Sequence, residues 1–143
     1  SPDEIKAACN ILDACISHIY HQRMLEVRNL DTAQQIEKYI NDNIAWDLSI
    51  EHLCAHFSVS RAELYQIFHT SFNSSVADYI RSKRISMAEQ MIRSTAMQVS
   101  EIASNVGFYD YNYFSKVFHR KFGCSPREYR KKLESGSEAA DKK

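Results

Sequence analysis

The sequence predicts an all-α fold in which one helical unit occurs twice. Aromatic and apolar residues of the first half return fifty residues later, and a repeat of that length marks a supersecondary unit used twice. The matching series are Leu64, Phe68, Phe72, Ser75 and Tyr79 in the first copy and Phe114, Phe118, Phe122, Ser125 and Tyr129 in the second. Only 3 glycines and 2 prolines occur among 143 residues, which favours helices over sheets.

Each copy has the pattern of a short helix, a tight turn, a longer amphipathic helix and a further helix, which is the layout of a helix-turn-helix unit. The short helices carry their own matching series, one residue out of phase with the first. It consists of Ile50, Leu53, Phe57 and Val59, and of Val99, Ile102, Val106 and Phe108. We therefore predict two helix-turn-helix subdomains joined by a long linker helix and preceded by an N-terminal amphipathic helix.

Residues 1–30 are predicted to form this amphipathic connector or dimerisation helix. Its apolar residues are spaced four, three, four and three positions apart, an a/d seam of about two heptads. The seam consists of Ile5, Cys9, Leu12, Ile16 and Ile19. It fits a connector packed on a neighbouring domain as well as the interface of a homodimer, and the spacing does not decide between the two.

The first subdomain is assigned to residues 31–78. We expect a hinge at residues 29–31, with Asp31 or Thr32 capping the next helix, because both residue types are favoured at helix starts. Four serines are predicted to begin later helices, since a hydroxyl can accept a hydrogen bond from the first turn of a helix. They are Ser49, Ser60, Ser75 and Ser125.

The linker helix is assigned to residues 75–93 and the second subdomain to residues 94–133. Gly107 is expected in the tight turn of this subdomain, where glycine adopts a left-handed backbone at little cost. Asp110 is expected to cap the longer helix and Gly123 to end it. Residues 134–143 are expected to form a polar, disordered tail.

Charge is distributed unevenly along a chain whose net charge is zero. Residues 31–78 carry two basic and seven acidic side chains, a net charge of −5. Residues 79–134 carry eleven basic and five acidic side chains, a net charge of +6. A basic region is what a nucleic-acid-binding protein needs, and here it lies mostly in the second repeat.

Cysteines and histidines give no evidence of a metal centre or a catalytic site. The cysteines lie far apart without CxxC spacing, so we expect reduced thiols, and the histidine pairs have no third ligand nearby. These residues are Cys9, Cys15, Cys54 and Cys124, with the pairs His18 and His21, and His52 and His56. Paired carboxylates, nucleophile–base motifs and phosphate loops are also missing from the sequence, so we expect neither an enzyme nor a cofactor.

No apolar stretch approaches the roughly 18 residues that a membrane span needs. We therefore expect no membrane association and a cytoplasmic location. The chain begins with Ser1 rather than methionine, from which we expect part of a longer protein.

The outward faces of the two longer helices carry side chains suited to reading base edges in the major groove. Gln and Asn can bond adenine, Lys can bond guanine, and Ala can contact the thymine methyl group. The candidate base contacts are Arg61, Ala62, Tyr65 and Gln66 in the first copy and Tyr111, Asn112, Ser115 and Lys116 in the second. Tyr113 is expected to pack inward. Any helix has a polar side, but two such faces at matching positions favour a shared reading function.

Phosphate contacts are expected from the starts of the helices and from nearby basic side chains. The candidates are Ser60, Arg81, Lys83, Arg84, Arg120, Lys121 and Arg127. A further basic cluster, Arg130, Lys131 and Lys132, is expected to form a solvated helix end.

At these residues the sequence resembles the AraC/XylS family of bacterial transcription regulators. The motifs that carry the resemblance are Ser100-Glu101-Ile102-Ala103, Val106-Gly107-Phe108, Tyr113-Phe114-Ser115-Lys116-Val117-Phe118, Lys121-Phe122-Gly123 and Ser125-Pro126-Arg127-Glu128-Tyr129-Arg130. Tyr79-Ile80-Arg81, Arg84-Ile85 and Ala88 are similar to the linker helix of that family. The resemblance covers residues 32–132.

The resemblance implies seven helices and two recognition helices that enter successive major grooves of double-stranded DNA. By position, the base contacts of the family fall on Ala62, Tyr65 and Gln66, and on Tyr111, Asn112, Ser115 and Lys116. The implied function is sequence-specific DNA binding by a transcription regulator, most often an activator, with RNA polymerase as a partner. The alternative is a helical protein-interaction module without DNA binding, which the acidic first repeat favours.

Overall fold

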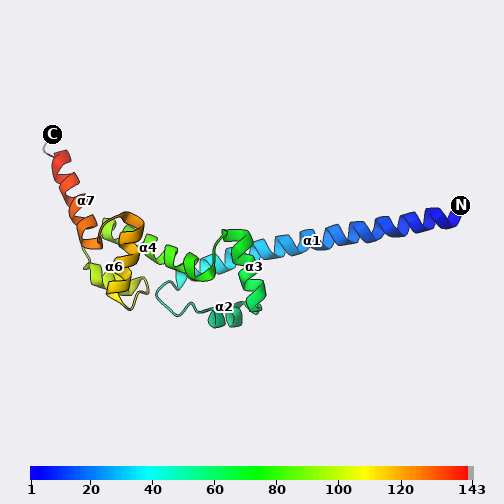
Figure 1. Ribbon diagram of the computed structural model, residues 1–143, viewed down its shortest axis with the longest axis horizontal. Coiled ribbons are helices and arrows are strands. Elements are labelled where there is room, and N and C mark those ends of the chain that lie inside the picture. The colour runs from blue at the N-terminus through cyan, green and yellow to red at the C-terminus, as the bar shows by residue number, and fades with distance from the viewer. Residues whose placement is uncertain (142–143) are drawn as a thin grey trace.

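The computed structural model describes residues 1–141, and within them the chain forms seven helices and no strand. The helices are α1 (Pro2–Asp42), α2 (Ile50–Phe57), α3 (Arg61–Phe72), α4 (Val76–Ser94), α5 (Val99–Asn105), α6 (Tyr111–Phe122) and α7 (Pro126–Asp141). Figure 1 shows two helical clusters joined along α4, with α1 extending far from one of them and α7 from the other. The predicted all-α fold with two helix-turn-helix units is confirmed.

The first cluster encloses a core built from the C-terminal part of α1, from α2 and α3, and from the beginning of α4. Its fully buried side chains are Ile36, Ile40, Leu53, Leu64 and Phe68. Phe72 and Tyr79 close this core from the far end of α3 and the start of α4, with ring centroids 4.4 Å apart.

The second cluster has a matching core between the C-terminal half of α4, α5, α6 and the start of α7. Its fully buried side chains include Ile85, Ile102, Val106, Phe114 and Phe118. Met87 of α4 packs against both cores. The linker helix α4 therefore contributes side chains to both cores and does not merely connect them.

Side-chain caps begin most helices where the sequence predicts them. The hydroxyls of Ser49, Ser60 and Ser75 each accept a hydrogen bond from the backbone three residues on, at 3.1–3.2 Å. Ser125 does the same for Glu128, whose carboxylate accepts from the Ser125 backbone in return, which completes a capping box.

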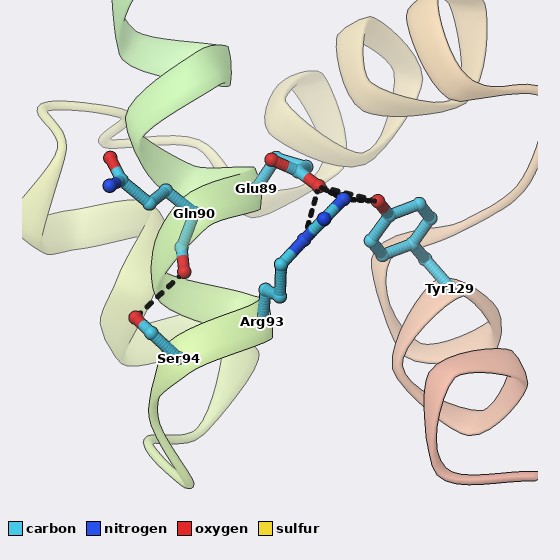
Figure 2. A network of polar contacts seen from close by, with 5 residues as sticks. All are labelled: Glu89, Gln90, Arg93, Ser94 and Tyr129. Atoms are coloured by element: carbon cyan, nitrogen blue, oxygen red, sulfur yellow. Dashed lines mark hydrogen bonds and ion pairs between the residues drawn. The ribbon is translucent and has the colours of Figure 1, made fainter. Parts of the chain in front are cut away.

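A polar network fixes α7 against α4. In Figure 2, Glu89 and Arg93 on α4 point toward Tyr129 on α7. The Tyr129 hydroxyl donates to the Glu89 carboxylate and accepts from Arg93 at 3.0 Å. The hydrogen bond from Tyr129 and the Arg93 charge hold the pKa of Glu89 below its usual range.

The expected hinge at residues 29–31 is wrong, because α1 runs through it as one helix of 41 residues. Thr32 does not cap a new helix; its hydroxyl donates to the carbonyl of Arg28, one turn earlier, at 2.9 Å. No glycine or proline interrupts this stretch, so nothing forces the helix to end. Every residue from Ser1 to Asp31 is exposed, and this part of α1 stands alone as a rod (Figure 1).

The expected disordered tail is also wrong over residues 134–141, which continue α7. No helix breaker other than Gly136 lies in this stretch, and a single glycine weakens a helix without ending it. Residues 142–143 lie outside the described residues. Among residues 1–141, no helix is long and apolar enough to cross a membrane.

Candidate nucleic-acid interface

The two longer helices, α3 and α6, bury matching faces and therefore expose matching ones. In α3, Leu64, Ile67 and Phe68 are buried, and in α6 the buried residues are Phe114, Val117 and Phe118, each fifty positions on. The positions between them point to solvent. The structure thus presents both predicted reading faces at the surface.

The face of α3 carries the predicted polar side chains in the open. Ala62, Tyr65 and Gln66 are all exposed, with 47% of the Tyr65 surface accessible. Arg61 is exposed too, but its guanidinium forms an ion pair with Glu51 of α2. This pair neutralises the only cation that the sequence places on this face.

The face of α6 differs from the prediction at two tyrosines. Tyr113, expected to pack inward, is 47% exposed. Tyr111, expected on the outer face, is half-buried beside Phe114, and the guanidinium of Arg127 lies 5.9 Å from its ring centre. Asp110 sets this phase, since its carboxylate accepts from the backbone of Asn112 at 2.9 Å and of Tyr113 at 3.4 Å. Tyr113 thereby joins the residues available on the reading face.

The remaining α6 side chains lie as predicted. Asn112 and Lys116 are exposed and Ser115 is half-buried. Ser115, Lys116, His119 and Arg120 border one shallow hollow on the outer surface of the helix. Among residues 1–136, neither Lys116 nor Arg120 forms an ion pair, so α6 presents free positive charge where α3 presents none.

The predicted phosphate contacts separate into free and engaged side chains. Arg120 and Arg127 are exposed, and Lys121 is exposed with its ammonium 3.0 Å from the Ser86 hydroxyl. Arg81 pairs with Asp78 at 2.9 Å and Lys83 with Glu37 at 3.3 Å. The Ser60 hydroxyl caps α3 and lies at the positive end of that helix.

Arg84 does not fit its predicted role as a phosphate contact. Its guanidinium is partly buried and donates to the backbone carbonyls of Ile44 and Trp46, each at 3.0 Å. Burial lowers the pKa of Arg84 from its ordinary value, against the opposing influence of Tyr109 and Asp47. Arg84 therefore holds the loop after α1 instead of a phosphate, and its prediction as a phosphate contact is wrong.

Arg130 likewise departs from the expected solvated helix end. It donates to the carbonyls of Met97, Ile92 and Thr95 and closes the loop between α4 and α5. An arginine in a basic run gives no sequence signal for such a role. The only general expectation is that the last carbonyls of α4, such as that of Ile92, have no partner within the helix and need a donor from elsewhere.

Comparisons with known proteins agree with this geometry. The sequence profile of a family described as "Helix-turn-helix domain" matches residues 53–132. The chain is 31% identical over 100 residues to the HTH-type transcriptional activator RhaR of Cronobacter sakazakii. That match covers 70% of this chain and 35% of the relative, so the chain spans about a third of the relative's length.

Solved structures share the same arrangement of helices. The C-terminal domain of the two-component response regulator yesN from Fusobacterium nucleatum has a TM-score of 0.65 at 27% identity, covering 70% of this chain and 98% of that domain. The DNA-binding domain of AdpA, solved in complex with a target DNA, has a TM-score of 0.69 at 20% identity, covering 72% and 93%. The chain belongs to the AraC/XylS family of helix-turn-helix transcription regulators.

Proposed function

We propose that the chain reads a specific double-stranded DNA site with α3 and α6 in successive major grooves on one face of the duplex. The observation that carries this proposal is the pair of matching exposed faces on α3 and α6. Ala62, Tyr65 and Gln66 on α3 would contact bases, and so would Asn112, Ser115 and Lys116 on α6. Arg61 and Tyr111 are also proposed as base contacts. To reach a base, Arg61 would have to break its ion pair with Glu51, and Tyr111 would have to move away from the Phe114 ring.

Positioning on the duplex is assigned to the phosphate contacts Ser60, Arg81, Lys83, Arg120, Lys121 and Arg127. Exposed ion pairs such as Arg81 with Asp78 contribute little stability, so a phosphate can replace the carboxylate at small cost. Because three of these five cations, Arg120, Lys121 and Arg127, lie in the second subdomain, that subdomain would supply most of the electrostatic attraction.

We also propose that the protein is a cytoplasmic transcription activator. The support is its likeness to RhaR, which is named as an activator. An activator raises transcription by favouring RNA polymerase at a promoter, and so polymerase is the proposed protein partner. The acidic first subdomain, with a net charge of −5, is the surface that a protein-interaction module would use instead of DNA.

Selection of duplexes from a random pool by this chain tests the reading function. We expect one enriched motif with two segments and an affinity that falls with salt at a slope of about −0.9 per phosphate neutralised. Equal affinity for every duplex, or affinity that does not depend on salt, would favour the protein-interaction module.

For the exposed part of α1 we propose pairing with a second copy through Ile5, Cys9, Leu12, Ile16 and Ile19. Ile16 is 63% exposed and Leu12 60%, a costly exposure for an apolar seam without a partner. Sedimentation equilibrium is expected to show a dimer that Ile16→Glu abolishes. Asn10→Glu places the same charge on the other side of the helix and is expected to leave the dimer intact. A wild-type monomer at high concentration would favour the connector role.

A further inference from the structure

Three segments from both subdomains meet at one joint. The first is the loop at residues 43–49 after α1, the second is Arg84 in the middle of α4, and the third is the turn at residues 106–110 between α5 and α6. They also border a groove of about 650 Å³ between the subdomains, lined among others by Trp46, Arg84 and Tyr109. At this joint the tight turn of the second unit approaches the backbone of the first.

Arg84 provides the polar contacts of the joint. Its Nε donates to the Ile44 carbonyl and one terminal nitrogen donates to the Trp46 carbonyl, each at 3.0 Å. A planar guanidinium can hold two carbonyls of one loop in a fixed orientation, which an ammonium cannot do. The arginine thus fixes the loop of the first subdomain to the shared helix.

Gly107 brings the second subdomain into the same contact. The glycine is buried with φ of +97°, and a Cβ at this position would lie 2.7 Å from the Ile44 carbonyl oxygen and 2.8 Å from Nε of Arg84. Only a residue without a side chain allows this approach. The Tyr109 hydroxyl, two residues on, lies 3.5 Å from the Ala45 carbonyl and extends the contact.

Two of the three segments, Arg84 and the turn at residues 106–110, lie between α3 and α6 in the chain, and α6 begins three residues after Phe108. A change in the joint therefore changes the position of α6 relative to α3. On DNA, one added base pair moves a segment by about 3.4 Å and rotates it by about 34°. The spacing that the protein accepts between its two DNA segments depends on how rigidly the joint is held.

We propose that Arg84 and Gly107 form a spacing lock, which sets the distance and rotation between α3 and α6 and so makes the protein select one separation of its two DNA segments. The inference rests on the proposed DNA binding. It assigns a specificity-determining role to residues that contact no base. Arg84 is a positioning residue here, because it acts through the loop and the turn.

The test uses the duplex that the wild-type chain selects from a random pool, together with duplexes that carry one or two base pairs more or fewer between the two segments. Wild-type affinity is expected to fall at least about tenfold for one inserted base pair, an effect of the size of a mismatched base. Arg84→Met keeps the apolar stem and removes both hydrogen bonds. For this variant we expect weaker binding to the selected duplex and less than about a threefold change with spacing.

Arg93→Met is the matched control. It removes an arginine from the same helix and from a polar network, but that network joins α4 only to α7 of the same subdomain. We expect the control to keep the wild-type dependence on spacing. An Arg84→Met variant that keeps this dependence as well would overturn the proposal.

Two further variants guard against loss of folding, which circular dichroism detects. Arg84→Lys keeps the charge but replaces the planar guanidinium with an ammonium, and we expect a spacing preference between those of the wild type and Arg84→Met. Gly107→Ala places a methyl group against Ile44 and Arg84 and is expected to shift the preferred spacing rather than only weaken it. Wild-type spacing in both folded variants would contradict the lock.

A measurement without DNA separates this proposal from the proposed function. Spin labels at Ala55 on α2 and Ser100 on α5, both exposed, report the distance between the subdomains. We expect one narrow distance distribution for the wild type and for Arg93→Met, and a broader one for Arg84→Met. If no duplex is enriched but the distributions differ in this way, the proposed DNA binding is wrong, whereas the role of Arg84 in fixing the two subdomains is supported. Equal distributions for all three proteins would refute the lock itself.

Discussion

Tyr79 and Tyr129 occupy matching positions in the two subdomains, but their hydroxyls have different surroundings. The Tyr79 hydroxyl is buried and, among the described residues, has no hydrogen-bond partner. The Tyr129 hydroxyl lies in the network with Glu89 and Arg93 that Figure 2 shows. Both rings nevertheless pack on the matching phenylalanines, Phe68 and Phe118, at 5.4 and 5.5 Å between centroids.

The same contrast recurs at the left-handed positions that end helices. The first subdomain uses Ser58 at φ of +53° and Asn73 at +48°, whereas the second uses Gly107 at +97° and Gly123 at +79°. Glycine adopts this backbone without the steric cost that a Cβ brings. The aromatic frame thus fixes the fold of each unit, and the residues around it make the second unit better satisfied and more basic than the first.

The largest expected effect tests whether the aromatic cores of the two subdomains contribute equally to stability. Phe68→Ala and Phe118→Ala each empty a fully buried position, and each is expected to lower the free energy of unfolding by about 3–5 kcal/mol. Urea unfolding followed by circular dichroism measures both. A much smaller loss for Phe68→Ala would show that the first core is loosely packed and would break the comparison.

The next effect tests the two reading faces. Gln66→Ala and Lys116→Ala should each cost about 1–3 kcal/mol on the selected duplex and relax the preference at one base position. Only Lys116→Ala removes a charge, so only it should also weaken the dependence of affinity on salt. Titrations at several salt concentrations measure both quantities. A uniform loss across sequences would place the side chain on a phosphate instead.

Smaller effects are expected at the left-handed positions. Ser58→Gly should raise the free energy of unfolding by about 0.5–1 kcal/mol. The glycine removes the steric cost of a Cβ in the left-handed region, and this gain exceeds the loss from the greater entropy of the unfolded chain. Gly123→Ala should lower it by about 1 kcal/mol, although nothing lies near the added methyl group. Thermal unfolding compares the two variants. A Ser58→Gly protein less stable than the wild type would show that the first unit tolerates its serine without strain.

A further effect concerns Tyr79 at alkaline pH. Burial, followed by the charge of Glu37, raises the pKa of Tyr79 to about 12. The folded chain therefore holds this proton more tightly than the unfolded chain, where tyrosine titrates near 10. Stability that is fully present below pH 10 is lost as the pH rises from about 10 to about 12. Tyr79→Phe should lose less stability over this window, while Tyr20→Phe on exposed α1 serves as the control.

The same substitutions distinguish the hydroxyls at neutral pH. Tyr79→Phe removes a buried hydroxyl without a partner and should be neutral or stabilising. Tyr129→Phe removes two hydrogen bonds and should destabilise. The reverse order would show that the Tyr79 hydroxyl has a partner that matters.

Local sequence signals predicted the helices and their starts well, because each start depends on residues within one turn. Ser49, Ser60 and Asp110 cap helices through contacts no more than three residues long. The hinge at residues 29–31 failed for a related reason. A favoured cap residue permits a helix start but does not impose one when the chain on both sides is already helical.

The site was less predictable where side chains act over long separations. Arg84 contacts carbonyls 38 and 40 residues away, and a basic residue on a linker helix gives no sign of such partners. The predicted positions of Tyr111 and Tyr113, one exposed and one buried, are the reverse of those in the structure. Two aromatic residues near a helix start fit either face until the position of the cap fixes the rotation of the helix. The reading faces themselves followed from the fifty-residue offset, which placed Gln66 and Lys116 correctly at the surface.

The unbroken course of α1 has a mechanical consequence. The helix is about 60 Å long, and its last turns, with Ile36 and Ile40, belong to the core under α3. Without a hinge, its two ends share one axis and one rotational phase. Each residue inserted into the exposed part would advance the far end by about 1.5 Å and turn it by about 100°. A rotation applied at the N-terminal end of the unbroken helix would therefore be passed to the core of the first subdomain and so to α3.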